Sequence, residues 1–528
     1  MRPHVVGMDT TAPRFDNRLL RQLPGDPETG ARRREVTGAA WSAVTPTPVA
    51  APSLLAHSAE MVERLGLDAT FVASPAFAEV FAGNRLLPGM QPWAANYGGH
   101  QFGHWAGQLG DGRAISLGEL QAPDGSYWEL QLKGAGPTPY SRGADGRAVL
   151  RSSIREFLCS EAMHHLGVPT TRALALLGTG EGVVRDMLYD GHPRAEPGAI
   201  VCRVAPSFIR FGSFELPASR GDQALTRQLV DVCIARDFPA LHGRGESLYA
   251  AWFADICERT AEMVSHWMRV GFVHGVMNTD NMSVLGQTLD YGPYGWVEDF
   301  DPDWTPNTTD AQGRRYRFGT QPQVAFWNLS RLAQAVAPLF GDVQPLQAGL
   351  GAYQARLLAC QRRDTAAKLG LAAADEADLA LHARWQHLMQ QGRMDMTLAY
   401  RALMRLDPAK PSAQVLDAVY YDPAGAQAIQ VQLQAWLEDY ASRLRGDPLD
   451  GPARQALMGA ANPVYVLRNW LAQEAIERAA EGDLGGVHTL QKVLRTPCTE
   501  RAGWERFAQK RPAWADHKPG CSMLSCSS

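Results

Sequence analysis

The stretch HGVMNTDN at residues 274–281, followed by DYG at residues 290–292, decides the fold and the chemistry that we expect of this chain. It offers an amide, Asn281, and a carboxylate, Asp290, on either side of a short apolar run. Magnesium prefers a few hard oxygen ligands of this kind, completed by phosphate and water. Both segments are also good turn sequences, but the apolar residues between them predict a strand–turn–strand pattern, which a simple turn does not explain. We therefore predict that Asn281 and Asp290 are metal ligands.

The spacing of the two segments is that of the catalytic loop and the metal-binding turn of protein kinases. In kinases an aspartate upstream of the metal-binding asparagine accepts the proton of the substrate hydroxyl. The equivalent position here is Val276, which can accept no proton, whereas a different acid, Asp280, directly precedes Asn281. We therefore expect a site that holds a nucleotide and Mg²⁺ and catalyses something other than ordinary γ-phosphoryl transfer.

Three upstream features complete a nucleotide clamp of kinase type. They are the glycine-rich stretch GQLGDGR at 107–113, Lys133 at the end of a predicted strand, and Glu156 early in a predicted helix. Each alone has a simpler interpretation: a hairpin turn, a strand-end lysine that reaches solvent, and a solvated helix residue. Their order along the chain matches that of the kinase clamp, with glycines before lysine, glutamate, asparagine and aspartate. We therefore expect Lys133 and Glu156 to form a partly exposed ion pair that contributes only about 0–1 kcal/mol to folding. A Walker-type P-loop is excluded, because the sequence contains no G-x-x-x-x-G-K-[ST].

The hydrophobic periodicity predicts an α+β fold with two lobes, like that of protein kinases. Predicted strands crowd the first part of the chain, and they cover residues 114–120, 127–132, 173–177, 183–188 and 199–204, with one long helix at 147–166 between them. Helices dominate later, at 223–240, 247–270 and 322–338, and an earlier helical stretch is predicted at 54–67. We divide the chain into an N-terminal extension (1–84), a nucleotide-clamping lobe (85–210), a helical lobe with the catalytic loop (211–480) and a tail (481–528).

Composition narrows the possible partners. The chain has 528 residues, of which 45% are hydrophobic and 20% charged, as expected of a soluble globular protein. A net charge of −4 gives no support for nucleic-acid binding. No apolar run is long enough to span a bilayer, and the first residues show no signal-peptide pattern. We expect a cytoplasmic monomer without nucleic-acid or membrane partners.

Cysteine and histidine residues are expected to be mainly structural. Six of the eight cysteines are scattered through mostly apolar segments and are predicted to be buried, whereas Cys521 and Cys526 lie in a polar tail where exposed, oxidisable thiols are expected. His100, His104 and His274 are interpreted as structural, because the glycines around the first two disfavour a metal-binding helix.

Five motifs together resemble the selenoprotein O family, the YdiU-type protein adenylyltransferases. They are FDNR at 15–18, NYGGHQFGHWAGQLGDGR at 96–113, LKGAGPTPYSR at 132–142, NTDNM at 278–282 and the terminal CSS at 526–528. The resemblance runs from about residue 13 to the last residue. It implies a kinase-like fold that binds ATP in a flipped orientation and transfers AMP to Ser, Thr or Tyr hydroxyls of proteins. UMP transfer from UTP is left open as an alternative.

The resemblance also assigns roles to individual residues. It implies Asp280 as the proton acceptor, Asn281 and Asp290 as ligands of Mg²⁺ or Mn²⁺, and a set of nucleotide contacts at Gly110, Gly112, Arg113, Lys133, Asp145, Gly146, Arg203, Arg210 and Asp290. A flipped nucleotide would place its α-phosphate near the metal and the attacking hydroxyl, and its β- and γ-phosphates near the arginines. Asp145, Gly146, Arg203 and Arg210 are implied by the resemblance alone.

Two other functions remain open at this point: a kinase that transfers the γ-phosphoryl group, which Val276 disfavours, and a nucleotide-binding scaffold without activity. One departure from the family pattern bears on regulation. Bacterial relatives can carry a cysteine in the loop after DYG that pairs with the C-terminal cysteine, but the loop at 300–310 contains none. A bridge between Cys521 and Cys526 is an alternative, and the last few residues are expected to be mobile when reduced.

Overall fold

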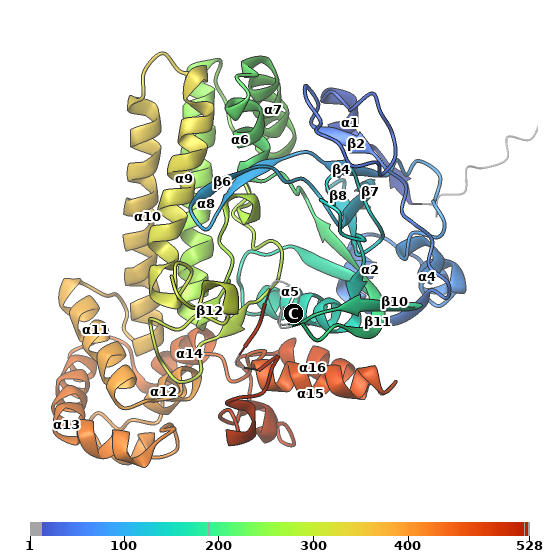
Figure 1. Cartoon of the computed structure of the whole chain (residues 1–528). Coiled ribbons are helices and arrows are strands. Elements are labelled where there is room, and N and C mark those ends of the chain that lie inside the picture. Colours follow the sequence, from blue (N-terminus) through green and yellow to red (C-terminus); the bar gives the residue numbers. More distant parts are fainter. Residues whose placement is uncertain (1–12, 188–190, 522, 526–528) are drawn as a thin grey trace, which may run out of the picture.

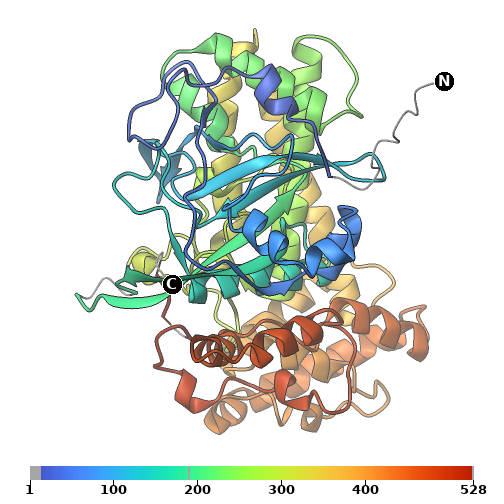
Figure 2. The same ribbon diagram turned by 90° about the vertical axis from the view of Figure 1, so that its right-hand side faces the viewer.

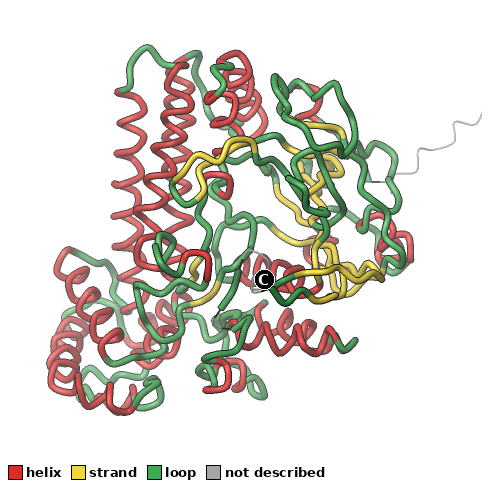
Figure 3. The backbone as a smooth tube through the Cα atoms, in the orientation of Figure 1, coloured by secondary structure: helices red, strands yellow, loops and turns green. Residues whose placement is uncertain are grey.

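The fold consists of a strand-rich part and a helical part, as predicted, and the two lie side by side (Figures 1 and 3). It is seen in a computed structural model that describes residues 13–187, 191–521 and 523–525. In the described part of the chain, no helix has the length and apolar composition needed to cross a membrane.

A nine-stranded sheet forms the strand-rich lobe, with the path β2-β4-β7-β8-β11-β10-β3 and with β1 and β9 paired to β7 and β11. Every pairing within it is antiparallel. The strands are β1 (Arg14–Phe15), β2 (Trp41–Ala43), β3 (Ser53–His57), β4 (Trp93–Ala95), β7 (Ala114–Gln121), β8 (Tyr127–Lys133), β9 (Ala148–Val149), β10 (Arg172–Arg185) and β11 (Arg194–Ala205). The predicted strands at 114–120, 127–132 and 199–204 are confirmed. The N-terminal residues contribute β1 to β3 to this same sheet.

The sheet is covered on both faces, which explains its apolar strands. Ile115, Leu130 and Ile200 belong to a core shared with α4 (Pro75–Phe81), and Val201 belongs to a second core shared with α5 (Leu150–His165). The helix predicted at 147–166 is therefore confirmed as α5, although it starts later, because Ala148 and Val149 pair with β11 as strand β9.

Two predictions about this lobe were wrong in detail. The stretches 173–177 and 183–188 were predicted as separate strands, but one strand, β10, runs through the first and into the second as far as Arg185. Its pairing with β11 shifts between Gly178 and Gly182. The glycines there interrupt the register without ending the strand. The helical stretch predicted at 54–67 begins instead as strand β3, which pairs with β10, and becomes helical only in α2 (Ala59–Arg64). Sheet pairing thus overrides the helical pattern before Ser58.

The helical lobe is built around three long helices, α8 (Glu246–Val270), α9 (Gln321–Val336) and α10 (Gln344–Leu369) (Figure 1). Together with α7 (Gln223–Asp237), they confirm the helices predicted at 223–240, 247–270 and 322–338. Gly271 adopts a left-handed conformation with φ 77° and ends α8. The other helices are α1 (Arg18–Gln22), α3 (Ala69–Val72), α6 (Phe211–Ser219), α11 (Glu376–Gln391), α12 (Met396–Leu403), α13 (Pro423–Arg445), α14 (Gly451–Ala461), α15 (Asn469–Ala480) and α16 (Gly485–Leu494).

Irregular segments join the lobes. Residues 274–281, here called the catalytic stretch, end in a short 3-10 turn at Thr279–Asn281. The residues after this turn form isolated bridges, Met282 with Thr288 and Ser283 with Arg210, in place of the full strands predicted there. Two small hairpins flank this region: β5 (Gly98–Gln101) with β6 (His104–Gln108), and β12 (Phe272–Val273) with β13 (Gly295–Trp296).

The C-terminal segment packs against both lobes. Figure 2 shows its red helices below the cyan strands, where α15 and α16 contact α5. The last described residues run beside the loop after DYG: the Thr308 amide donates to the Leu524 carbonyl at 2.8 Å, and the Leu524 amide donates to Pro306 at 3.1 Å. Residues 523–525 are therefore docked, so the expectation that the last residues are mobile is wrong for them.

Candidate active site

A cavity of about 720 Å³ lies between the sheet and the catalytic stretch. Its walls contain ten of the residues singled out from the sequence, namely Gly110, Gly112, Arg113, Lys133, Asp145, Gly146, Arg203, Asp280, Asn281 and Asp290. Val276 lines it as well, whereas Arg210 lies behind the wall and is 1% exposed. Residues far apart in the sequence therefore meet in one polar cavity large enough for a small ligand.

Lys133 and Glu156 form the predicted ion pair. The Lys133 Nζ lies 2.6 Å from Glu156 Oε2 and 3.6 Å from Asp290 Oδ1. Glu156 is buried on α5, so the interpretation of a solvated helix residue is excluded. Burial lowers the pKa of Lys133, although Glu156 and Asp290 act in the opposite direction. The pair ties the end of β8 to α5 and leaves the ammonium at the cavity wall.

Asp290 is held by cations from β11 and from the start of α6. Its Oδ1 accepts a hydrogen bond from Arg203, and its Oδ2 accepts one from Arg210 at 2.7 Å. Burial would raise the pKa of this carboxyl, but Arg203, Arg210 and Lys133 hold it well below its usual range. Asp290 has a φ of 55°, a backbone conformation that a non-glycine residue adopts only when its surroundings enforce it. The three cations outnumber the two carboxylates of Glu156 and Asp290, which leaves positive charge for an anionic ligand.

Asp280 differs from Asp290 in its electrostatics. Burial raises the pKa of Asp280 to about 7, against the opposing effect of Arg210. Its Oδ2 accepts a hydrogen bond from the Gln101 amide at 3.3 Å, and in the described part of the chain its buried Oδ1 has no hydrogen-bond partner. Gly99 packs directly against this carboxyl, and a Cβ there would lie 2.9 Å from Oδ1. A carboxyl poised near neutral pH beside a cavity is suited to proton transfer.

Asn281 is fixed by the residue that replaces the kinase base. Its Nδ2 donates to the Val276 carbonyl at 2.9 Å, so the amide oxygen is the atom of this side chain that could bind a metal. His274 is structural, as predicted: it is buried, and its Nε2 lies 2.9 Å from the Leu289 carbonyl oxygen. His100 and His104 lie on β5 and β6, so the helix that a metal-binding pair would need is absent there.

The glycines at the opposite wall allow close approach of the backbone. A Cβ on Gly112 would lie 2.9 Å from the Tyr140 carbonyl oxygen, and one on Gly146, where φ is 68°, only 2.1 Å from that of Gly136. Asp111, between the glycines, is a structural acid: it is buried, accepts from Tyr97 and Ala95, and has a pKa raised by burial. The glycine-rich stretch at 107–113 is thus more closely packed than a simple hairpin turn.

Arg185 and Gln101 are among the cavity residues that were not predicted from the sequence. Arg185, at the end of β10, pairs with Asp145 at 2.6 Å, and Gln101 donates to the Asp280 carboxylate. No motif spacing points to Arg185, because only the fold of the β10–β11 hairpin brings it to Asp145. Gln101 lies inside the long motif at 96–113, where its position offered a signal that we did not use.

Three side chains of the cavity carry oxygen atoms of the kind that Mg²⁺ binds. Asn281 offers an amide oxygen, and Asp280 offers a buried oxygen without a hydrogen-bond partner among the described residues. Asp290 offers a carboxylate with a depressed pKa, whose two oxygens here accept from Arg203 and Arg210 and would exchange these bonds for the cation. Hard oxygen donors in small number are what Mg²⁺ requires when phosphates complete its coordination.

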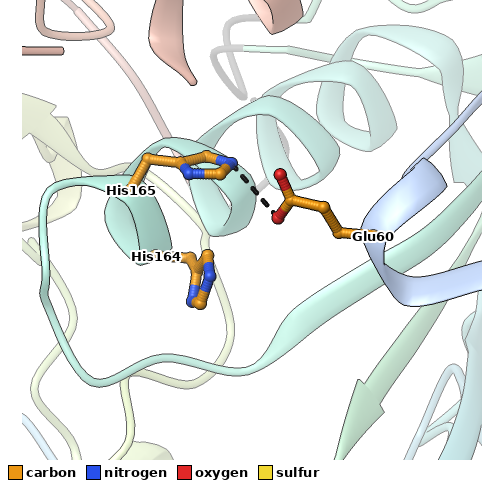
Figure 4. Close-up of side chains that lie close together, drawn as sticks. All are labelled: Glu60, His164 and His165. Carbon is orange, nitrogen blue, oxygen red and sulfur yellow. Dashed lines mark ion pairs between the residues drawn. The ribbon is translucent and has the colours of Figure 1, made fainter. Parts of the chain in front are cut away.

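A second cluster of possible metal ligands lies outside this cavity. The ligand atoms of Glu60, His164 and His165 lie within 4.8 Å of one another, and Figure 4 shows the His165 ring facing the Glu60 carboxylate. Both Glu60 oxygens are already used by arginines, Oε1 by Arg495 at 2.6 Å and Oε2 by Arg172 at 3.2 Å. The cluster is therefore part of an ion-pair network, and it lies apart from the cavity that contains Asp280 and Asp290.

The cysteines are less exposed than expected at the C-terminus. Cys159, Cys202, Cys233, Cys257 and Cys360 are buried, as predicted, and Cys498 is half-buried. Cys521 was expected to be exposed but is 3% exposed, and burial raises the pKa of its thiol to about 12. The prediction of an oxidisable Cys521 was wrong, because the tail packs against the protein; Cys526 lies outside the described residues.

Known proteins match nearly the whole chain. The family model described as "Protein adenylyltransferase SelO" matches residues 31–495. A relative named "Protein nucleotidyltransferase YdiU" from Xanthomonas axonopodis pv. citri (strain 306) is 70% identical over 515 residues, which cover 98% of this chain and 99% of the relative. A protein of the same name from Xanthomonas euvesicatoria pv. vesicatoria (strain 85-10) is 70% identical over 514 residues, 97% of this chain and 99% of its own length. The chain therefore belongs to the SelO family of protein adenylyltransferases.

Proposed function

We propose that this protein transfers AMP from ATP to serine, threonine or tyrosine hydroxyls of other proteins and releases pyrophosphate. The observation that carries the proposal is the position of Asp280 in a cavity of kinase type. Val276 stands where a kinase has its base, and Asp280, with a pKa of about 7, lies beside the residues suited to metal and phosphate. Family membership supports the same activity.

Asp280 acts as the general base in this proposal. In its ionised form it accepts the proton of the acceptor hydroxyl, whose oxygen then forms a bond to the α-phosphorus of ATP. The bond from the α-phosphorus to the α,β-bridging oxygen breaks, and the electron pair leaves with pyrophosphate. The hydrogen bond from Gln101 orients the carboxylate toward the acceptor, and Gly99 leaves room for it.

The remaining cavity residues bind and orient the nucleotide. The positive charge of Lys133, Arg203 and Arg210, in excess over Glu156 and Asp290, favours the triphosphate. The glycine segments allow backbone amides to approach phosphate oxygens, and Arg113, Asp145 and Gly146 complete the contacts. We propose the flipped orientation, with the α-phosphate toward Asp280 and the β- and γ-phosphates toward the arginines.

Asn281 and Asp290 would hold the divalent cation, which we propose to be Mg²⁺ or Mn²⁺. When bound, the cation neutralises phosphate charge at the α-phosphorus. Asp290 is prepared for this role because its low pKa keeps it ionised, and Asn281 because its amide is fixed on Val276.

We further propose a cytoplasmic protein that works as a monomer, divided near residues 84, 210 and 480. UMP transfer from UTP uses the same chemistry at the α-phosphorus and is a possible second reaction of this site. The proposal includes no nucleic-acid partner, since the net charge is −4. It includes no membrane partner either.

The products of the reaction test the proposed activity. The full-length protein is incubated with ATP, Mg²⁺ and an acceptor protein, and both the mass of the acceptor and the inorganic product are measured. We expect the acceptor mass to increase by one AMP group. One pyrophosphate should be released for each transfer. Phosphorylated acceptor with ADP as the product would show a kinase, and ATP binding without any modified acceptor would show an inactive scaffold.

A further inference from the structure

The β5–β6 hairpin is the part of the strand-rich lobe that reaches across to the catalytic turn and α9 (Figure 1). The His100 amide donates to Thr279 Oγ1 at 2.7 Å, and the adjacent Gln101 side chain donates to Asp280 Oδ2 at 3.3 Å. At its tip, the Phe102 amide donates to the Tyr316 hydroxyl at 2.9 Å. The hairpin is therefore fixed to the catalytic turn, one residue away from the proposed base.

Its other strand presents an aromatic side chain to solvent. Trp105 is 40% exposed, among the few large hydrophobic side chains in the described residues with such exposure. The His100 ring packs between two tryptophans, with its centroid 5.1 Å from Trp105 and 5.5 Å from Trp327 of α9. Tryptophan is the residue type most enriched where a protein binds another protein. This exposed ring is thus held against His100 on the hairpin whose Gln101 lines the cavity.

Two arginines add positive charge to the same surface. The guanidinium carbons of Arg315 and Arg331 lie 4.6 Å and 4.8 Å from the centre of the Trp327 ring. Neither arginine forms an ion pair with a carboxylate of the described residues. Both lie outside the walls of the nucleotide cavity, so their charge is not needed for ATP.

Two nearby acids form hydrogen bonds with groups other than these guanidinium ions, although the Asp310 carboxylate also interacts electrostatically with Arg315. The Asp310 carboxylate is buried and accepts from the backbone amides of Arg315 and Tyr316. Glu215 is buried and accepts from Thr279 at 2.8 Å. The positive charge of the two arginines is therefore left for a partner with acidic side chains.

We propose that Trp105, Trp327, Arg315 and Arg331, here called the hairpin surface, dock the acceptor protein through an acidic segment next to the hydroxyl to be modified. The inference rests on the proposed function and names its substrate class. Trp105 would pack against an apolar or aromatic side chain of that segment, and the arginines would bind its carboxylates. Charge complementarity then selects which hydroxyls reach Asp280.

Binding and transfer to two matched peptides test this proposal. Both contain one serine and one leucine, one with flanking glutamates and the other with flanking lysines. Binding to the full-length protein is measured by fluorescence anisotropy at low and high salt, and AMP transfer by mass spectrometry. We expect the glutamate peptide to bind on the order of tenfold more tightly and to lose this preference at high salt. Equal binding of both peptides would overturn the proposal.

Surface variants separate this inference from the fold and from the proposed function. Trp105→Ala and Arg331→Glu should each weaken binding of the glutamate peptide on the order of tenfold, with ATP binding unchanged. Trp514→Ala and Arg384→Ala are matched controls, because Trp514 is 46% exposed and the Arg384 side chain 53% exposed elsewhere, and they should bind as the unchanged protein does. Selective binding without AMP transfer would refute the proposed function and leave the docking surface standing. Transfer to both peptides with equal efficiency would refute the docking surface and leave the proposed function standing.

Discussion

Asp280 and Asp290 are both buried carboxyl groups of one cavity, yet their surroundings drive them in opposite directions. Burial dominates at Asp280 and raises its pKa to about 7, whereas Arg203, Arg210 and Lys133 prevail at Asp290 and keep it ionised. Two carboxyls with separated pKa values can divide the work of a base and a metal ligand. This separation of the two pKa values explains how a kinase-like cavity can function with Val276 at the usual place of the base.

The pH dependence of transfer should report the ionisation of Asp280. A base must be deprotonated, so kcat/KM is expected to rise with pH and level off above about 7. Asp280→Asn keeps the size of the side chain and should lower transfer on the order of 10²–10⁴-fold, while ATP binding persists. A pH-independent rate, or equal loss of ATP affinity in this variant, would show that Asp280 is not the base.

The same substitution has an expected effect on stability. A group whose pKa is raised on folding stabilises the protein at low pH, and this contribution is lost as pH rises through the folded-state pKa. Asp280→Asn cannot ionise, so its melting temperature should exceed that of the unchanged protein at pH 8 and match it more closely at pH 5. The comparison is made without nucleotide or metal.

Asp290→Asn should impair both binding and stability. The substitution removes the charge that pairs with Arg203 and Arg210, whose side chains are 3% and 2% exposed. Breaking a buried ion pair from one side costs on the order of 3–5 kcal/mol. Chemical denaturation checks the cost, with Asp439→Asn as control, because the Asp439 side chain is 57% exposed and its pair should contribute only about 0–1 kcal/mol. Similar losses in both variants would contradict this account of the cluster.

At the scale of elements, α5 and the strands β8 and β11 bring the clamp together. Glu156 of α5 contacts Lys133 of β8 at 2.6 Å and Arg203 of β11 at 3.1 Å. The sequence led us to expect a partly exposed pair with little effect on folding. The side chains of Lys133 and Glu156 are only 11% and 4% exposed, so the pair is part of the core.

The two members of this pair should differ in their effect on folding. Glu156→Gln removes one of the two carboxylates that Lys133 and Arg203 share, leaves only Asp290 to pair with both, and should cost on the order of 3 kcal/mol. Lys133→Met should cost less, because Arg203 still neutralises Glu156, yet both variants should lose ATP affinity. Denaturation and nucleotide titration of the two variants give the comparison, and a larger stability loss for Lys133→Met would contradict the shared role of Glu156.

Much of the fold and of the cavity could be predicted because local signals agreed with long-range structure. The apolar strands at 114–120 and 199–204 and the order of Lys133, Glu156 and Asp290 could be read from the chain itself. The helical pattern at 54–67 misled because pairing with β10 decides the structure of residues 53–57. Arg185 and Leu524 could not be assigned, since their contacts join segments far apart in the sequence.

On the scale of the whole molecule, the C-terminal residues are connected to the catalytic stretch through one loop. Leu524 is fully buried against the loop at 304–310, and Asn307 of that loop donates from its side chain to the Gly275 carbonyl at 3.0 Å. Asn469 holds the tail through the Cys521 carbonyl at 2.8 Å. The tail thus supports the loop that lies behind the active site without any disulfide to it.

Leu524→Ala should loosen this loop and lower transfer several-fold. Removing a buried leucine side chain costs on the order of 2–5 kcal/mol, and here the loss falls on the local docking of the tail. The Thr308 amide, which donates to Leu524, should then exchange its hydrogen faster. Met523→Ala is the neighbouring control, because Met523 is 37% exposed and should leave exchange and transfer unchanged. Equal behaviour of the two variants would mean that the tail does not support the loop.

We propose that the kinase-like cavity transfers the AMP group of ATP, with Asp280 as the base. The most direct measurement uses ATP labelled either at the α- or at the γ-phosphorus, with the unchanged protein and Asp280→Asn side by side. We predict that an acceptor protein takes up label only from α-labelled ATP and that Asp280→Asn transfers little from either. Label appearing on the acceptor from γ-labelled ATP alone would contradict the account and identify the protein as a kinase.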